Sequence, residues 1–125
     1  MAAGKYSFII EQGSTVDFTI VYNDSNGNPV NLSQYNSKMQ IRETYGSAPL
    51  LTLSSSLNED GTGLNMSNAA SGAIEIYIAS CTSSMLTFYE AIYDLDIISG
   101  SGDCPIVTRI LEGKVKLSKE VTVVN

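Results

Sequence analysis

The sequence predicts an all-β domain in which two sheets of short strands enclose one hydrophobic core. Three observations predict it. Apolar and polar residues alternate along most of the chain, which is the period of a strand with one buried face. Clusters of Gly, Asn, Ser and Pro interrupt this alternation at regular intervals, as turns do. No window keeps a helical period for as many as ten residues.

The composition is that of a single folded domain. Hydrophobic residues make up 43% of the 125 residues and charged residues 16%, which excludes a disordered chain. A globule of this length buries roughly two-thirds of the surface that its unfolded chain exposes, so it needs neither a metal nor a disulfide to fold. We expect one domain over residues 1–125, with 1–4 and 119–125 as contact tails.

The first half of the chain contains five predicted strands. Their expected inward-facing residues are Tyr6, Phe8 and Ile10; Val16, Phe18, Ile20 and Tyr22; Met39, Ile41 and Tyr45; Leu51 and Leu53; and Leu64 and Met66. Asn26-Gly27 lies between the second and third strands and supplies the positive-φ positions of a tight reversal.

The second half contains three further predicted strands and one helical turn. The expected inward-facing residues are Ile74, Ile76 and Ile78; Ala91, Tyr93, Leu95 and Ile97; and Val107, Leu111, Val115 and Leu117. Residues 80–86 are the predicted helical turn, with Ser80 or Thr82 as its cap. In the last strand, Gly113 permits a bulge or a close backbone approach.

The order and spacing of these strands favour a particular sandwich. Residues 99–103 form a flexible reversal between two long strands, and long loops lie in the middle of the chain. This suits Greek-key connections, so we predict an immunoglobulin-like β-sandwich of seven to eight antiparallel strands. The chain has no Trp and lacks the Cys spacing of antibody domains.

Charge and hydropathy exclude two classes of partner. The net charge is −6, and the basic residues form no cluster that a phosphate backbone would reward. We therefore expect no nucleic acid and no membrane as partners. No apolar segment is long enough to span a bilayer, and the start of the chain does not have the apolar run of a secretory signal.

The residues needed for catalysis or cofactor binding are missing. The chain has no His, and therefore lacks the commonest general base and metal ligand. Asp24, Asn26 and Asn28 imitate the start of a calcium loop, but the Gly and Glu that complete such a loop are absent. Asp94 and Asp96 share one strand face, where we expect either a solvent-facing charge or a cross-strand ion pair of Asp94 with Arg109. We predict no enzyme, no cofactor and no metal site.

Two cysteines leave the redox chemistry open. Cys81 and Cys104 each lie in a predicted loop beside a strand end. They can form a disulfide in an oxidising compartment or remain reduced thiols.

Apolar residues at unexpected positions are the candidate protein contacts. Four lie on strand faces that should meet water: Ile9, Val21, Ile92 and Ile98. Three more lie in the β-prone tail: Val121, Val123 and Val124. Strands that are apolar on both faces indicate a second covering layer. The tail either lies on a neighbour's sheet edge or extends the last strand.

Exposed tyrosines offer an alternative function. A carbohydrate- or cell-surface-binding module would need Tyr35, Tyr45 and Tyr89 to converge on one patch, where their rings could stack on sugars.

Several turn-and-strand motifs resemble a known family. They are Gly13–Phe18, Tyr22–Leu32, Met39–Arg42, Ser71–Ile74, Tyr93–Asp96 and Thr108–Gly113 followed by Val115. Together they cover nearly the whole chain and resemble small immunoglobulin-like virion proteins of tailed bacteriophages. They are similar, more loosely, to the amino-terminal domains of baseplate upper proteins.

The resemblance implies a non-enzymatic structural subunit of the virion, in the tail, baseplate, neck or head decoration. It implies other virion proteins as partners, symmetric multiple copies, and assembly in the cytoplasm of the bacterial host. A baseplate anchor usually continues into a further domain, whereas this sequence ends at Asn125. We therefore expect a stand-alone fibre adaptor or decoration protein.

Overall fold

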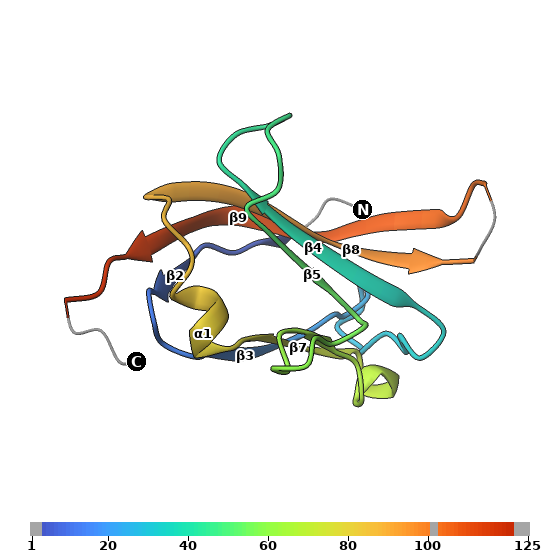
Figure 1. Cartoon of the computed structure of the whole chain (residues 1–125). Coiled ribbons are helices and arrows are strands. Elements are labelled where there is room, and N and C mark those ends of the chain that lie inside the picture. Colours follow the sequence, from blue (N-terminus) through green and yellow to red (C-terminus); the bar gives the residue numbers. More distant parts are fainter. Residues whose placement is uncertain (1–3, 101–102, 122–125) are drawn as a thin grey trace.

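The computed structural model describes residues 4–100 and 103–121. The chain folds into two facing sheets (Figure 1). The larger sheet has the order β1-β9-β8-β4-β5, with β2 also paired to β9. The smaller sheet has the order β3-β7-β6. The chain moves between the sheets several times, which confirms the predicted β-sandwich.

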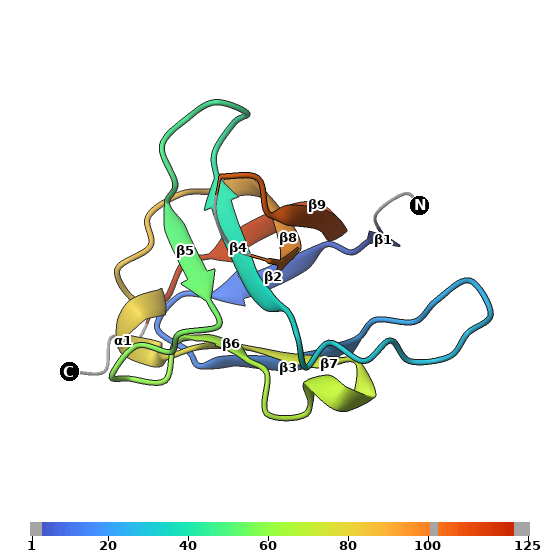
Figure 2. The same ribbon diagram turned by 90° about the vertical axis from the view of Figure 1, so that its right-hand side faces the viewer.

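The element bounds in the described ranges are β1 (Gly4–Lys5), β2 (Phe8–Glu11), β3 (Val16–Val21), β4 (Asn36–Arg42), β5 (Leu51–Ser54), β6 (Gly63–Asn65), the 3-10 turn η1 (Ala69–Ser71), β7 (Ala73–Ile78), α1 (Ser80–Ser83), β8 (Glu90–Ser99) and β9 (Ile106–Ser118). Ala79, not Ser80 or Thr82, is the N-cap of α1. Two loops, 22–35 and 43–50, project from the body of the sandwich (Figure 2).

The core fills the space between the inner faces of the two sheets. Ile74, Ile76 and Ile78 of β7 are fully buried because β7 is the central strand of the smaller sheet. Leu95 of β8 and Met39 of β4 face them from the larger sheet and are also fully buried. The predicted inner faces of these three strands are confirmed.

An aromatic cluster joins the two sheets near the start of the chain. The ring centroid of Phe8 in β2 lies 5.1 Å from that of Phe18 in β3 and 5.1 Å from that of Tyr93 in β8. The Tyr6 ring lies 5.7 Å from the Phe18 ring. Tilted and edge-on pairs at such distances are the favourable aromatic geometries. The predicted inward position of Tyr6 is only partly met, because its side chain is 46% exposed.

The N-terminal strands pair with β9 in parallel, which differs from the antiparallel arrangement predicted for every strand. Gly4 is opposite Leu111 in β1, and Phe8 is opposite Val115 in β2. Gly4 therefore belongs to the sheet rather than to a tail. The predicted first strand is divided at Tyr6, whose backbone carbonyl accepts a hydrogen bond from the Tyr93 hydroxyl.

Gly113 is the close backbone approach that its sequence position predicts. A Cβ atom built on Gly113 would lie 2.0 Å from the carbonyl oxygen of Tyr6. Any side chain there would push the segment between β1 and β2 away from β9. The register shift of β9 lies elsewhere, since Leu95 is opposite Leu111 while Asp96 is opposite Arg109.

The extra residue at this shift, Ile110, is buried, and it reverses the faces of the strand before it. Val107, predicted to face the core, is therefore 53% exposed. The predicted inward position of Tyr45 is also wrong, because β4 ends at Arg42 and the Tyr45 side chain is 90% exposed in the following loop.

We predict that Gly113→Ala destabilises the fold while Gly4→Ala does not. The clash with the Tyr6 carbonyl is a backbone clash, and overpacking of this kind costs about 1–3 kcal/mol of unfolding free energy. A Cβ on Gly4 meets only ordinary contacts, the nearest being Leu111 Cδ1 at 3.5 Å. Urea denaturation of both variants measures the difference, and equal stability of the two would contradict this account of Gly113.

Candidate functional site

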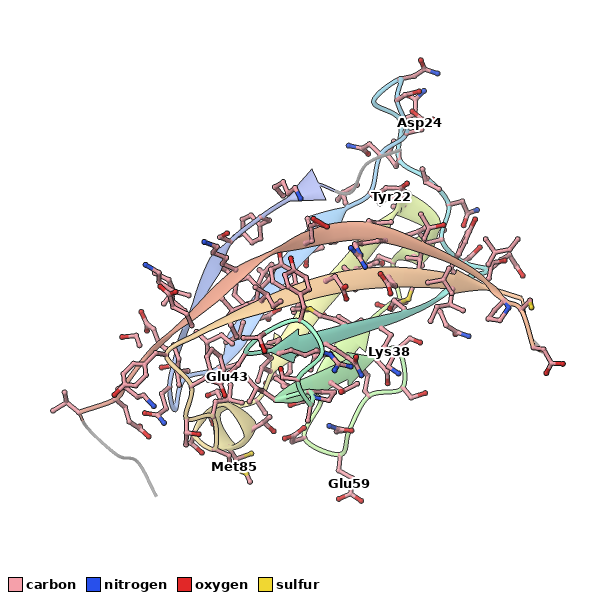
Figure 3. The ribbon with its side chains drawn as sticks, turned by 90° about the horizontal axis from the view of Figure 1, so that it is seen from above. Tyr22, Asp24, Lys38, Glu43, Glu59 and Met85 are labelled. Carbon is pink, nitrogen blue, oxygen red and sulfur yellow. The ribbon has the colours of Figure 1, made fainter. Side chains whose placement is uncertain are left out.

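A cleft of about 560 Å³ lies on the outer face of the larger sheet. Figure 3 looks onto this face, where β8 and β9 arch across the molecule. Its base is formed by β4, β8 and β9, and Tyr45 and Gly46 of the projecting loop 43–50 contribute to one side.

Ion pairs cross the cleft between strands. Arg109 Nη2 lies 3.4 Å from Asp94 Oδ2, and Arg109 Nη1 lies 3.5 Å from Glu112 Oε1. Lys5 of β1 forms a salt bridge with the same Glu112. The predicted pairing of Asp94 with Arg109 is confirmed.

Most of the positive charges of the chain lie on the outer face of the larger sheet. Six of the seven Lys and Arg residues lie on the outer face of the larger sheet together with five carboxylates, so its net charge is +1. The rest of the chain has one Lys and eight carboxylates, which gives −7. Of the four cations that line the cleft, Lys5 and Arg109 form salt bridges with carboxylates.

The fold shifts the pKa values of the Asp96 and Glu112 carboxyls in opposite directions. Burial, assisted by the neighbouring charge of Asp94, raises the pKa of the Asp96 carboxyl, and the Asp96 Oδ1 atom is buried without a hydrogen-bond partner. The hydrogen bond from Lys5 lowers the pKa of the Glu112 carboxyl. The fold therefore disfavours the ionised form of Asp96 and stabilises the ionised form of Glu112.

Other polar groups are engaged in turns. The Asp60 carboxylate accepts hydrogen bonds from the Thr62 backbone N–H at 2.9 Å and the Thr82 hydroxyl at 2.8 Å, which lower its pKa. Asp24 Oδ1 accepts the backbone N–H groups of Asn26 and Asn28. The bonds within two to four residues are ordinary turn contacts, whereas the Thr82 hydroxyl ties the Asp60 loop to α1.

The described ranges contain no group of three His, Cys, Asp or Glu side chains that could hold a metal ion. They also contain no helix that is both long and apolar enough to cross a bilayer. Cys81 and Cys104 are free thiols, and both are exposed.

The structure disperses most of the predicted contact residues. Ile9 is 63% exposed beside Lys116, and Val21 is 51% exposed on the other sheet. Ile92 lines the cleft and is half-buried. Val121 is 98% exposed, while Val123 and Val124 lie outside the described residues, as do 1–3 of the N-terminal tail.

One predicted residue belongs to an apolar group that the sequence did not indicate. Ile98 lies directly opposite Val107 at the end of the β8–β9 hairpin, and the adjacent Ile106 is 69% exposed. Ile106 and Val107 are not among the predicted contact residues, because alternation alone places Val107 in the core. The two consecutive apolar residues Ile110 and Leu111 are the signal of a bulge that could have corrected this.

The tyrosines proposed for sugar stacking do not converge. Tyr35 precedes β4 and packs against the core, whereas Tyr45 follows the other end of the same strand. The Lys119 ammonium lies over the Tyr89 ring, with Nζ 5.0 Å from the ring centroid.

Comparison with known proteins shows the fold. No family model matches the sequence, and no curated protein sequence matches it. The structure is similar to that of a chicken TCR, with a TM-score of 0.54 and 14% identity over 93% of this chain and 54% of that chain. It is also similar to the N-terminal domain of phage TP901-1 ORF48, with a TM-score of 0.50 and 11% identity over 94% of this chain and 86% of that one. The sandwich is thus immunoglobulin-like, as predicted.

We predict that Asp96→Asn and Glu112→Gln change stability in opposite directions at neutral pH. The fold raises the pKa of the Asp96 carboxyl above the ordinary Asp value of 3.8. The contribution of this carboxyl to stability is therefore present below pH 3.8 and falls as the pH rises. Asp96→Asn should therefore raise the melting temperature at neutral pH. The lowered pKa of Glu112 means that its contribution is present above 4.5 and is lost as pH falls, so Glu112→Gln should lower the melting temperature.

Thermal unfolding at neutral pH and at about pH 3 measures both differences, which should shrink in acid as the wild-type carboxyls become protonated. Shifts of the same sign in the two variants at neutral pH would show that this electrostatic description of the cleft is wrong.

Proposed function

We propose that the chain is a non-enzymatic structural subunit of a tailed-phage particle and acts through contacts with other virion proteins. The observation that carries this proposal is the likeness to the N-terminal domain of phage TP901-1 ORF48, which extends over 94% of this chain. It agrees with the virion-protein motifs of the sequence. One line of support rests on sequence motifs and the other on the path of the backbone.

The surface supports a contact role. Large apolar side chains are exposed on both sheets, including Ile9 at 63%, Val21 at 51% and Ile106 at 69%. Ion pairs of Arg109 with Asp94 and Glu112, and of Lys5 with Glu112, partly neutralise the charges of the cleft. Exposed apolar area and unpaired strand edges are the means by which sandwich domains bind one another.

The finer proposal is a fibre adaptor or decoration protein present in symmetric multiple copies, assembled in the host cytoplasm. A single domain that fills the described chain, with loops projecting from its body, suits a small subunit between larger ones. A carbohydrate-binding module gains no support, because Tyr35, Tyr45 and Tyr89 lie apart.

Particles of the phage or prophage that encodes the chain test this proposal. We expect purified particles to contain the chain in a fixed ratio to the major tail or head protein, measured by quantitative mass spectrometry. Antibodies to loop 22–35, which projects from the sandwich, should label one structure of the particle in electron micrographs.

Particles produced without the gene are the control and should lose both signals. Purified wild-type particles that lack the chain would contradict a virion role. Catalytic turnover by the purified protein would contradict the non-enzymatic part of the proposal.

A further inference from the structure

Two of the four cations that line the cleft have no carboxylate beside them. Lys5 and Arg109 form salt bridges, whereas no carboxylate of the described residues lies within salt-bridge distance of Arg42 or Lys114. The strand register brings this second pair together. Arg42 of β4 and Lys114 of β9 both lie opposite Ile92 of β8, one on each side. These three residues therefore form one row across the outer face, with a cation at each end.

The carboxylates of the adjacent rows are engaged by other cations. On one side of the row, Asp94 and Glu112 lie opposite each other and both pair with Arg109. On the other side, Glu90 Oε1 lies 3.7 Å from Lys116 Nζ. Neighbouring strands lie about 4.8 Å apart, so the backbones of the two unpaired cations are roughly 10 Å apart and both side chains can reach one group between them. An anion placed there would have two cations to itself.

Arg42 is held in position, whereas Lys114 is not. Arg42 Nη2 donates to Gln40 Oε1 at 2.8 Å, and Nη1 donates to the backbone carbonyl of Ser47. A guanidinium has five N–H donors, so donors remain for a ligand. Because the group is already fixed, it loses less side-chain entropy on binding a carboxylate. The Lys114 side chain is exposed and has no hydrogen bond or ion pair with the described residues.

Apolar groups lie beside the two cations. Ile92 between them is half-buried, and Tyr45 lines the same cleft from loop 43–50 with its side chain 90% exposed. In Figure 3, the labelled Glu43 marks the start of this loop, directly after the end of β4. Inorganic phosphate would leave these apolar surfaces uncovered. A carboxylate attached to an apolar body would use the cations and the apolar surfaces together.

We propose that the cleft binds an acidic segment of a partner protein, with a Glu or Asp carboxylate between Arg42 and Lys114 and an adjacent apolar side chain against Ile92 and Tyr45. Charge-assisted hydrogen bonds to a carboxylate are stronger than those between uncharged groups. Charge complementarity of this kind selects the partner and speeds the encounter. The inference concerns the binding chemistry of the purified chain and does not depend on a virion role.

An NMR titration of the purified full-length chain with a capped Leu-Glu-Leu peptide at low ionic strength tests the proposal. We expect saturable shifts of the backbone amide resonances of Arg42, Ile92 and Lys114, with a Kd on the order of 1 mM. A capped Leu-Gln-Leu peptide has nearly the same shape without the charge. It should bind at least about tenfold more weakly.

Lys114→Gln should weaken binding of the Leu-Glu-Leu peptide by about threefold or more, because one of the two cations is lost. Lys116→Gln is the matched control. Lys116 lies two residues further along the same strand and is also exposed, but it does not line the cleft. This control should bind the peptide as the wild type does, and circular dichroism should show that both variants are folded.

The proposal is overturned if the Leu-Gln-Leu peptide binds as tightly as the Leu-Glu-Leu peptide, or if the two Lys variants weaken binding equally. Inorganic phosphate that binds the same residues as tightly as the acidic peptide would identify a general anion site and overturn the protein segment as the ligand. The same amide shifts on concentrating the chain alone would identify a second copy, in place of a different protein, as the occupant.

Discussion

The contact of Phe8 with Phe18 and Tyr93 is the interaction on which the rest of this structure depends. Immunoglobulin domains of antibodies join their sheets by a disulfide packed on a Trp. This chain has no Trp, and its two cysteines are both free. The three rings hold β3 of the smaller sheet against β2 and β8 of the larger one, with both Phe8 distances at 5.1 Å. Burial of the Tyr93 ring within this cluster raises the pKa of its phenol, so the hydroxyl remains a donor to the Tyr6 carbonyl.

The position of Phe8 determines which strand edges remain open. Because β1 and β2 pair with β9, β3 has β7 on one side and no partner strand among the described residues on the other. An edge is a low-cost binding site because its backbone groups are already aligned.

Alternation predicted the sandwich and the inner faces of β4, β7 and β8, because a central strand has one face against the core along its whole length. Alternation did not predict the features that depend on contacts between residues far apart in the sequence. The parallel pairing of β1 and β2 depends on Gly113 meeting Tyr6, residues more than a hundred positions apart. The bulge at Ile110 moved Val107 outward. The cleft likewise brings Lys5 to Glu112 from opposite ends of the chain, so only Asp94, Asp96 and Arg109 could be grouped from the sequence.

A double-mutant cycle on Phe8 and Phe18 tests the central claim most directly. Phe8→Leu, Phe18→Leu and the double variant keep a hydrophobic side chain at each position. The cycle cancels the contacts that each ring makes with Tyr93 or Tyr6, so the coupling energy reports the Phe8–Phe18 pair. Unfolding free energies from urea denaturation should give a coupling energy of about 1 kcal/mol between the two positions. Additive effects, with a coupling energy near zero, would contradict the claim that this ring contact joins the sheets.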